Sequence, residues 1–181
     1  MKSKAIRNLS LSALFCAIQC VCSVLSVQIT VIPVTLATFG VFLTGLCLPV
    51  YMAAPAQLAY LLIGGIGLPV FAGFASGFGV LLGPTGGYLW SYPLVAAAVS
   101  LFTALSAKSN RKVFRWGLQI VGCLLGLALC YLCGTLQFIG LKAIPFSAGL
   151  KTCVLPFIPF DLIKMALAVV IGDRIRRGIR K

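Results

Sequence analysis

The feature of this sequence that most constrains its fold is a series of long apolar runs with almost no charge inside them. Runs of about 20 residues are long enough to cross a bilayer as a helix, and several follow one another along the 181 residues. Charged residues make up 9% of the chain, whereas a soluble domain carries about 25%. Because so few charges cannot cover a water-facing surface, we predict a single integral membrane domain over residues 1–181.

Prolines, glycines and basic residues divide the apolar sequence into six predicted spans. Residues 31–63 are too long for one span and contain Pro49, so we divide them into two spans that turn near Leu48 and Pro49. The other spans are predicted over residues 5–27, 88–107, 116–139 and 156–171. A glycine-rich connection, residues 64–87, and a loop, residues 142–155, complete the chain.

The basic residues predict the orientation of these spans. Fifteen Lys and Arg against two acids give a net charge of +13, and twelve of the fifteen lie in residues 2–7, 108–115 and 174–181. Short basic segments prefer the cytoplasm, and these three share one side only if an even number of spans separates each pair. We therefore predict an all-α protein of the cell membrane with six transmembrane helices and both termini in the cytoplasm. A nucleic-acid binder would need its bases on a soluble face instead.

Several kinds of chemistry lack the residues that they require. The chain has no histidine and no glutamate, and its only acids are Asp161 and Asp173. Catalysis by Ser-His-Asp, by Cys-His or by paired carboxylates is thereby excluded, as are histidine metal sites. Most of the eight cysteines lie within apolar runs, where cysteine packs as a small hydrophobic residue, and the chain has no Walker A motif. We expect no enzyme activity, no catalytic residue, no metal site and no cofactor.

Residues 73–88, with the sequence GFASGFGVLLGPTGGY, are the densest motif in the chain. So many glycines disfavour a continuous helix, and irregular backbone at membrane depth is tolerated only against protein or a water-lined cavity. Glycine also lets the backbone approach a ligand closely, so Gly86 is a candidate binding position. The alternative is a glycine-rich segment that only packs helices together.

Asp161 and Lys164 lie in the segment PFIPFDLIK, residues 156–164, and their i, i+3 spacing places them on one helix face. An ionisable residue inside a membrane costs about 2.5–3.5 kcal/mol on insertion scales, so such residues are usually functional. We predict that this pair binds substrate. The alternative is an ion pair that only begins the helix, with Asp161 near its N-terminus.

Two pairs of small residues permit close approach of helices. Ala13 and Ala17 lie four residues apart in the first span, and Gly122 and Gly126 have the same spacing in the fifth. Small residues at this spacing serve contacts with a partner protein or packing within the chain. The spacing alone does not separate these two roles.

Together these segments resemble the BioY family, the biotin-specific substrate-binding (S) components of energy-coupling-factor (ECF) transporters. The resemblance covers nearly the whole chain and is strongest in residues 69–74, 83–88 and 156–164. Residues 32–39, IPVTLATF, are similar to the family's P-x-T-L-Q-T segment, but Ala37 stands where glutamine is usual. That difference removes any side-chain contact that the glutamine makes.

The resemblance implies biotin uptake through six helices with a pocket open to the outside, driven by a transmembrane coupling protein and two ATPases. Asp161 would accept a ureido N–H of biotin, and Lys164 would donate to the ureido carbonyl or pair with the carboxylate. Ala13 and Ala17 match the face that S components present to their transmembrane partner. The full set of expected substrate-binding residues is Asp161, Lys164, Thr85, Gly86, Tyr88, Phe74 and Thr35.

Other functions remain open at this point. Another vitamin or a small anionic solute would suit the same scaffold. An intramembrane protease of the rhomboid type is disfavoured because the chain has no histidine. A purely structural membrane protein would leave Asp161 and the glycine-rich segment without a role.

Overall fold

The computed structural model describes residues 2–27 and 32–179, and most of them belong to helices. The helices are α1 (Lys2–Val24), α2 (Ala37–Cys47), α3 (Val50–Gly65), α4 (Phe78–Leu82), α5 (Gly86–Ser106), α6 (Lys112–Lys142), α7 (Phe146–Cys153) and α8 (Ile158–Ile179), with a short 3-10 turn, η1 (Ala72–Phe74). Two antiparallel strands of two residues each, β1 (Ser26–Val27) and β2 (Val34–Thr35), pair Ser26 with Thr35. The predicted all-α class is confirmed.

Helix length gives a smaller number of clear membrane spans than the sequence predicts. Among the described residues, α1, α5 and α6 are each long and apolar enough to cross a bilayer, and α7 with α8 forms a fourth candidate, bent by 52°. Helices α2 and α3 are apolar, but they contain only 11 and 16 residues. Six spans and cytoplasmic termini therefore stay predictions.

Proline explains why the apolar stretch of residues 31–63 breaks where it does. Leu48 and Pro49 are both extended, with ψ angles of 149° and 159°, and α3 begins at the next residue. A residue that precedes proline is disfavoured in the α conformation, so α2 ends before this pair. The predicted turn is confirmed. The predicted loop over residues 142–155 is wrong in part, because α6 extends to Lys142 and α7 follows within the loop.

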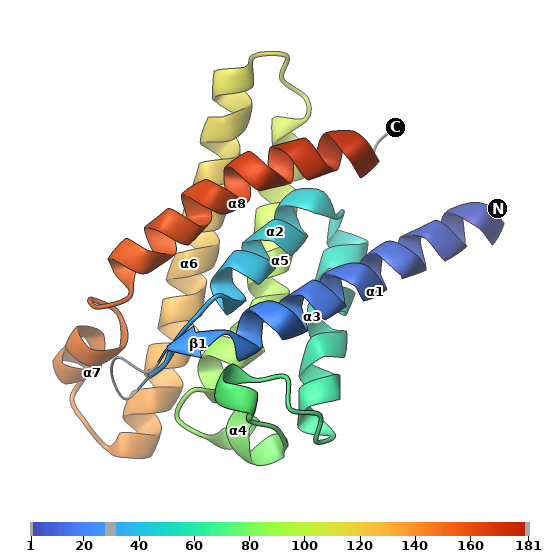
Figure 1. The fold of residues 1–181 in the computed structure, drawn as a ribbon. Helices are drawn as coiled ribbons and strands as arrows, with labels where there is room; N and C mark the ends of the chain where they lie inside the picture. The colour runs from blue at the N-terminus through green and yellow to red at the C-terminus, as the bar shows by residue number, and fades with distance from the viewer. Residues whose placement is uncertain (1, 28–31, 180–181) are drawn as a thin grey trace.

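Close approach of α5 and α6 depends on glycine (Figure 1). A Cβ atom at Gly87 would overlap the Cys133 carbonyl oxygen, and one at Gly134 would overlap the ring of Tyr88. A Cβ atom at Gly122 would lie 2.6 Å from the Cβ atom of Phe102. Gly122 and Gly126, the glycine pair of the fifth predicted span, therefore serve packing within the chain.

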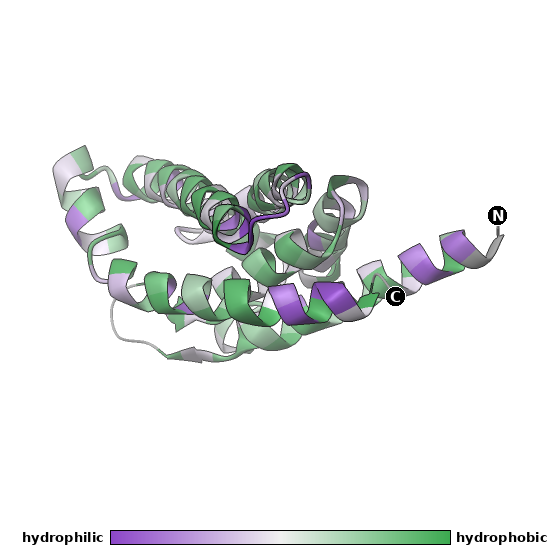
Figure 2. Cartoon of the chain, turned by 90° about the horizontal axis from the view of Figure 1, so that it is seen from above, coloured by the Kyte–Doolittle hydropathy of each residue, from purple (hydrophilic) through white to green (hydrophobic). Residues whose placement is uncertain are grey.

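Ala13 and Ala17 differ from those glycines because both lie exposed on the outer face of α1. The same face carries large exposed apolar side chains such as Leu9 and Val21, which are 73% and 63% accessible. Figure 2 shows that hydrophobic residues cover most of the helices, whereas hydrophilic residues gather in the first turns of α1 and the last turns of α8. This distribution suits helices surrounded by lipid.

The three basic segments gather toward one end of the molecule. In Figure 1 the α5–α6 connection lies at the top, and the start of α1 and the end of α8 lie on the right, whereas α4, β1 and α7 lie lower. This common placement agrees with the even number of spans required between the basic segments. We call the end that carries these basic segments the basic end.

Candidate functional site

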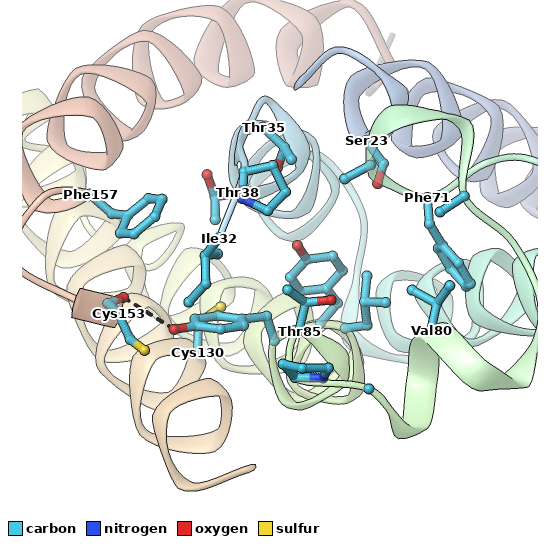
Figure 3. Close-up of a pocket in the computed structure, with 18 of the residues that line it drawn as sticks. Ser23, Ile32, Thr35, Thr38, Phe71, Val80, Thr85, Cys130, Cys153 and Phe157 are labelled. Carbon is cyan, nitrogen blue, oxygen red and sulfur yellow. Dashed lines mark hydrogen bonds between the residues drawn. The ribbon is translucent and has the colours of Figure 1, made fainter. Parts of the chain in front are cut away.

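A cavity of about 440 Å³ is lined in part by α4 and α7, which lie at the end opposite the basic end (Figure 1). Its wall combines Ser23 near the end of α1, some of residues 32–38, some of residues 71–85, and side chains from α5, α6, α7 and the start of α8. In Figure 3, Phe71 and Val80 lie on one side, Phe157 and Cys153 on the other, and Thr38 and Thr85 between them. Its size falls within the range of small-molecule sites, which is about 300–1,000 Å³.

The glycine-rich segment forms one wall of this cavity and is largely irregular, as predicted. Gly73 and Gly77 have φ angles of 65° and 90°, a left-handed region that favours glycine, and they turn the chain on either side of Ala75. Ala75, Gly79, Val80, Gly83 and Thr85 contribute to the wall. The segment therefore lines a cavity, which its packing interpretation alone does not explain.

Side chains from two long helices hold this wall in place. Gln137 Nε2 on α6 donates to the carbonyl oxygens of Leu81 and Gly83, at 3.1 and 2.8 Å. Trp90 Nε1 on α5 donates to the same Leu81 oxygen at 3.1 Å. Because backbone carbonyls are strong acceptors and these three bonds join the segment to two long helices, they fix it against α5 and α6.

Asp161 is the centre of a polar cluster on the opposite wall. Its Oδ1 atom accepts hydrogen bonds from Thr38 Oγ1 at 2.7 Å and from Lys164 Nζ at 2.8 Å. Its Oδ2 atom accepts from the Tyr131 hydroxyl at 2.7 Å. We call Asp161, Thr38, Tyr131 and Lys164 the Asp161 cluster; it joins α2, α6 and α8.

Lys164 lies behind Asp161 and is not part of the cavity wall. Residues Asp161 and Lys164 are 3% and 8% accessible, so each charge depends on the other for compensation. Lys164 Nζ also lies 3.4 Å from Thr38 Oγ1, which therefore accepts from the lysine and donates to the aspartate. The two predicted interpretations of the pair are thus compatible, because the ion pair holds a carboxylate at the cavity surface.

Aromatic side chains contribute to the apolar wall. Tyr88, Tyr92, Phe71 and Phe157 line the cavity, and Tyr60 lies behind two of them. The Tyr60 ring packs edge-on against Phe71 and stacks on Tyr92, with centroid distances of 5.5 and 6.3 Å. Tyr88 donates from its hydroxyl to the Cys153 carbonyl at 3.1 Å, which ties α5 to α7. These rings suit a flat apolar ligand.

Five of the seven predicted substrate-binding residues come together at this cavity. Thr35, Thr85, Tyr88 and Asp161 line it, and Lys164 supports Asp161. Phe74 does not line it, because its side chain is 70% accessible on the outer side of the glycine-rich segment. Gly86 does not line it either.

The structure corrects the reasons for which Gly86 was singled out. Gly86 begins α5, and its φ angle is not among the positive values, so a left-handed conformation does not explain the glycine. A Cβ atom there would overlap the Leu81 carbonyl oxygen and lie 2.6 Å from Gln137 Nε2. Gly86 therefore permits the close packing that holds the cavity wall. Ala37, which stands where glutamine is usual in the family, is buried and also lies outside the cavity wall.

Sequence reasoning missed several residues of the site. Tyr131 lies in an apolar run between Cys130 and Leu132. Thr38 lies in the segment IPVTLATF, residues 32–39, but only Thr35 of that segment was expected to bind substrate. Gln137 offered a usable signal, because an amide within an apolar span usually has a polar partner. Lys142 was assigned to a loop, but it ends α6 and lies at the edge of the cavity. Among the described residues there is no cluster of three potential metal ligands.

Comparisons with known proteins agree with this architecture. The BioY family model matches residues 1–181. The chain is 36% identical to the probable biotin transporter BioY of Pyrococcus horikoshii, with 97% of this chain and 98% of the relative covered. It is 35% identical to biotin transporter BioY2 of Lactococcus lactis, with 99% and 95% covered.

A solved structure is also similar. The crystal structure of the S-component for biotin from an ECF-type ABC transporter superposes with a TM-score of 0.88 and 26% identity, over 98% of this chain and 94% of that one. The family match covers every residue, and the relatives are matched over nearly their full length. This chain therefore belongs to the BioY family.

Proposed function

We propose that this chain binds biotin as the S component of an ECF-type transporter and takes part in biotin uptake. The observation that carries the proposal is the cavity itself, which joins an apolar aromatic wall to a buried carboxylate in a chain of the BioY family. Relatives matched over their whole length bear the name biotin transporter, and the similar solved structure is an S-component for biotin. The chain performs no covalent catalysis.

Biotin suits the two kinds of surface in this cavity. Its fused rings are compact and apolar, and its ureido group offers two N–H donors and one carbonyl acceptor. We assign the rings to the walls formed by Tyr88, Tyr92 and Phe157. We assign the ureido group to the Asp161 cluster. A carboxylate has about four acceptor positions, and Asp161 uses three of them for protein donors, which leaves one for a ureido N–H.

The carboxylate end of biotin needs a cation away from Asp161. Lys164 already bonds Asp161 and lies outside the cavity wall. Lys142 is exposed at the cavity edge, and the chain's other acid, Asp173, is bonded to Arg115 and Arg177 elsewhere. We therefore assign the biotin carboxylate to the Lys142 side, where no carboxylate of the chain repels it.

Uptake against a gradient requires an energy source that this chain does not supply, since it has no Walker A motif. We propose that a transmembrane coupling protein and two ATPase subunits energise it, and that ATP is used only by those partners. The exposed face with Ala13 and Ala17 on α1 is our candidate for the contact with the coupling protein. In the predicted orientation, the cavity of this six-helix cell-membrane protein faces the outside.

Equilibrium binding of radiolabelled biotin to the purified chain tests the binding proposal. Saturable binding that unlabelled biotin displaces is the expected result. Binding of another vitamin or small anion in preference to biotin would support the alternative substrate on the same scaffold. No saturable binding of biotin, desthiobiotin or lipoate by folded protein would falsify the proposal.

Leucine substitutions on α1 test the contact with the coupling protein. We expect Ala13→Leu and Ala17→Leu to abolish uptake and copurification of the partner subunits, while biotin binding by the isolated chain stays near wild type. Ala128→Leu is the matched control, because Ala128 is an exposed alanine on α6. If binding and uptake fall together, α1 packs within the chain at these positions and the docking assignment is wrong.

A further inference from the structure

A second cavity, of about 320 Å³, lies at the basic end of the molecule. It is enclosed by the start of α1, the α2–α3 connection, the second half of α5 and the last turns of α8. We call it the basic-end cavity. Its described lining shares no residue with the cavity assigned to biotin. It therefore requires a separate explanation.

Two arginines make the basic-end cavity cationic. Arg7 of α1 and Arg176 of α8 both line it, and the described lining contains no acidic side chain. Arg176 is only 5% accessible, and its Nη1 atom lies 3.4 Å from the Thr103 carbonyl oxygen of α5. Asp173, one turn earlier on α8, bonds Arg115 and Arg177 and does not line the cavity. The cavity thus favours an anion.

Thr103 supplies a second, independent indication of a ligand. Its side chain lines the basic-end cavity, the residue is 5% accessible, and its hydroxyl has no hydrogen-bond partner among the described residues. A buried hydroxyl without a partner costs about 1–3 kcal/mol, so native proteins usually satisfy such groups. An oxygen of an anion held between the two arginines would accept this hydrogen bond.

The surroundings indicate the kind of anion. Apolar side chains, including Leu11, Met52 and Ile179, form much of the rest of the lining, and Tyr51 contributes an aromatic ring that is 69% accessible. A ligand that contacts both parts of this wall must combine a compact negative group with apolar chains. Basic pockets between membrane helices are also typical sites for anionic lipid headgroups.

We propose that the basic-end cavity binds the phosphate of an anionic membrane lipid, between Arg7 and Arg176 and with Thr103 as a hydrogen-bond donor. The acyl chains then lie against the apolar part of the cavity lining, which includes Leu11, Met52 and Ile179. The lipid holds α1 against α5 and α8 at the end where the helix termini meet. This site is independent of biotin and of its binding residues.

The test uses the purified full-length chain in micelles that contain phosphatidylglycerol or phosphatidylcholine with identical acyl chains. We expect phosphatidylglycerol to be retained in native mass spectra and to raise the thermal unfolding temperature more than phosphatidylcholine does. Arg7→Gln and Thr103→Val should each reduce retained phosphatidylglycerol, the arginine variant by about fivefold. Lys108→Gln is the matched control, since Lys108 is an exposed base at the same end outside the cavity.

Biotin binding shows whether each variant is folded, because neither Arg7 nor Thr103 lines the biotin cavity. Equal retention of the two lipids, or an equal loss in Lys108→Gln, would overturn the proposal in favour of diffuse surface charge. Stabilisation by inorganic phosphate alone that is lost in Arg7→Gln would identify a soluble anion instead of a lipid. Unchanged lipid retention by Arg7→Gln with lost copurification of partner subunits would overturn the proposal in favour of a protein contact.

Discussion

The Asp161–Lys164 pair offers a test that separates the stability of the site from its affinity. Their charged atoms are 2.8 Å apart, and both residues are more than nine-tenths buried. An asparagine side chain has nearly the shape of the aspartate, so shape alone predicts that Asp161→Asn folds normally. The structure leads to a different expectation, because Lys164 would then remain buried without its counter-ion. Removing one partner of a buried pair costs about 3–5 kcal/mol.

A double-mutant cycle measures this coupling. The variants are Asp161→Asn, Lys164→Met and the two combined, and the assay is reversible unfolding followed by tryptophan fluorescence. We expect Asp161→Asn to lose about 3–5 kcal/mol of unfolding free energy. Lys164→Met should lose less, because Thr38 and Tyr131 still donate to Asp161. The double variant should recover part of the loss, with an interaction energy of about 0.5–3 kcal/mol.

Biotin affinity gives the second readout of the same variants. If Asp161 accepts a ureido N–H, Asp161→Asn should weaken binding by about 1.5–3 kcal/mol, which is about 10- to 150-fold. This loss of affinity should persist in the double variant, which contains no buried lysine without a counter-ion. Wild-type affinity of the folded double variant would refute the assignment of Asp161 to the ligand. Strictly additive stability losses would refute the ion-pair argument.

Three further expectations follow from the cavity. Gly86→Val should reduce the yield of folded protein, because its side chain would overlap the Leu81 carbonyl; wild-type yield on size-exclusion chromatography would contradict this. Tyr131→Phe removes a donor to the Asp161 carboxylate and should lower the unfolding free energy by about 1.5–3 kcal/mol, measured by chemical denaturation. Lys142→Ala should weaken biotin binding a few-fold, because an exposed ion pair is worth up to about 1 kcal/mol, and the weakening should be larger at low salt. Lys151, an exposed lysine outside the cavity, is the control, and equal weakening by Lys151→Ala would argue against a carboxylate contact.

Much of the fold was predictable because local chemistry determines it. Pro49 ends α2 at the predicted place, and the connection that contains Lys108 and Arg111 separates α5 from α6. The short helix α7 was not predictable in the same way. It lies in a segment with basic and polar residues, and it is fixed by contacts such as Tyr88 with the Cys153 carbonyl.

Sequence reasoning found site residues that carry a charge, which is unusual inside a membrane, and missed others with uncharged side chains that are common there. Asp161 and Lys164 were conspicuous as charges within an apolar run. Tyr131 lies 30 residues before Asp161 and Thr38 lies 123 residues before it, so only the tertiary fold brings them together. Phe74 shows the opposite case, because membership of the glycine-rich motif does not determine which way its side chain faces.

The Asp161 cluster has a consequence for the order in which the protein is completed during synthesis. Its two hydroxyl donors come from α2 and α6, which leave the ribosome before α8, whereas the acceptor Asp161 lies in α8. The hydroxyls of Thr38 and Tyr131 therefore have no Asp161 carboxylate to bond until the last helix is made. A chain interrupted before residue 158 contains the glycine-rich wall and most of the aromatic rings, yet it lacks the group that unites the polar side of the cavity. Binding competence consequently depends on the last helix, and any copy interrupted before Asp161 lacks a complete site.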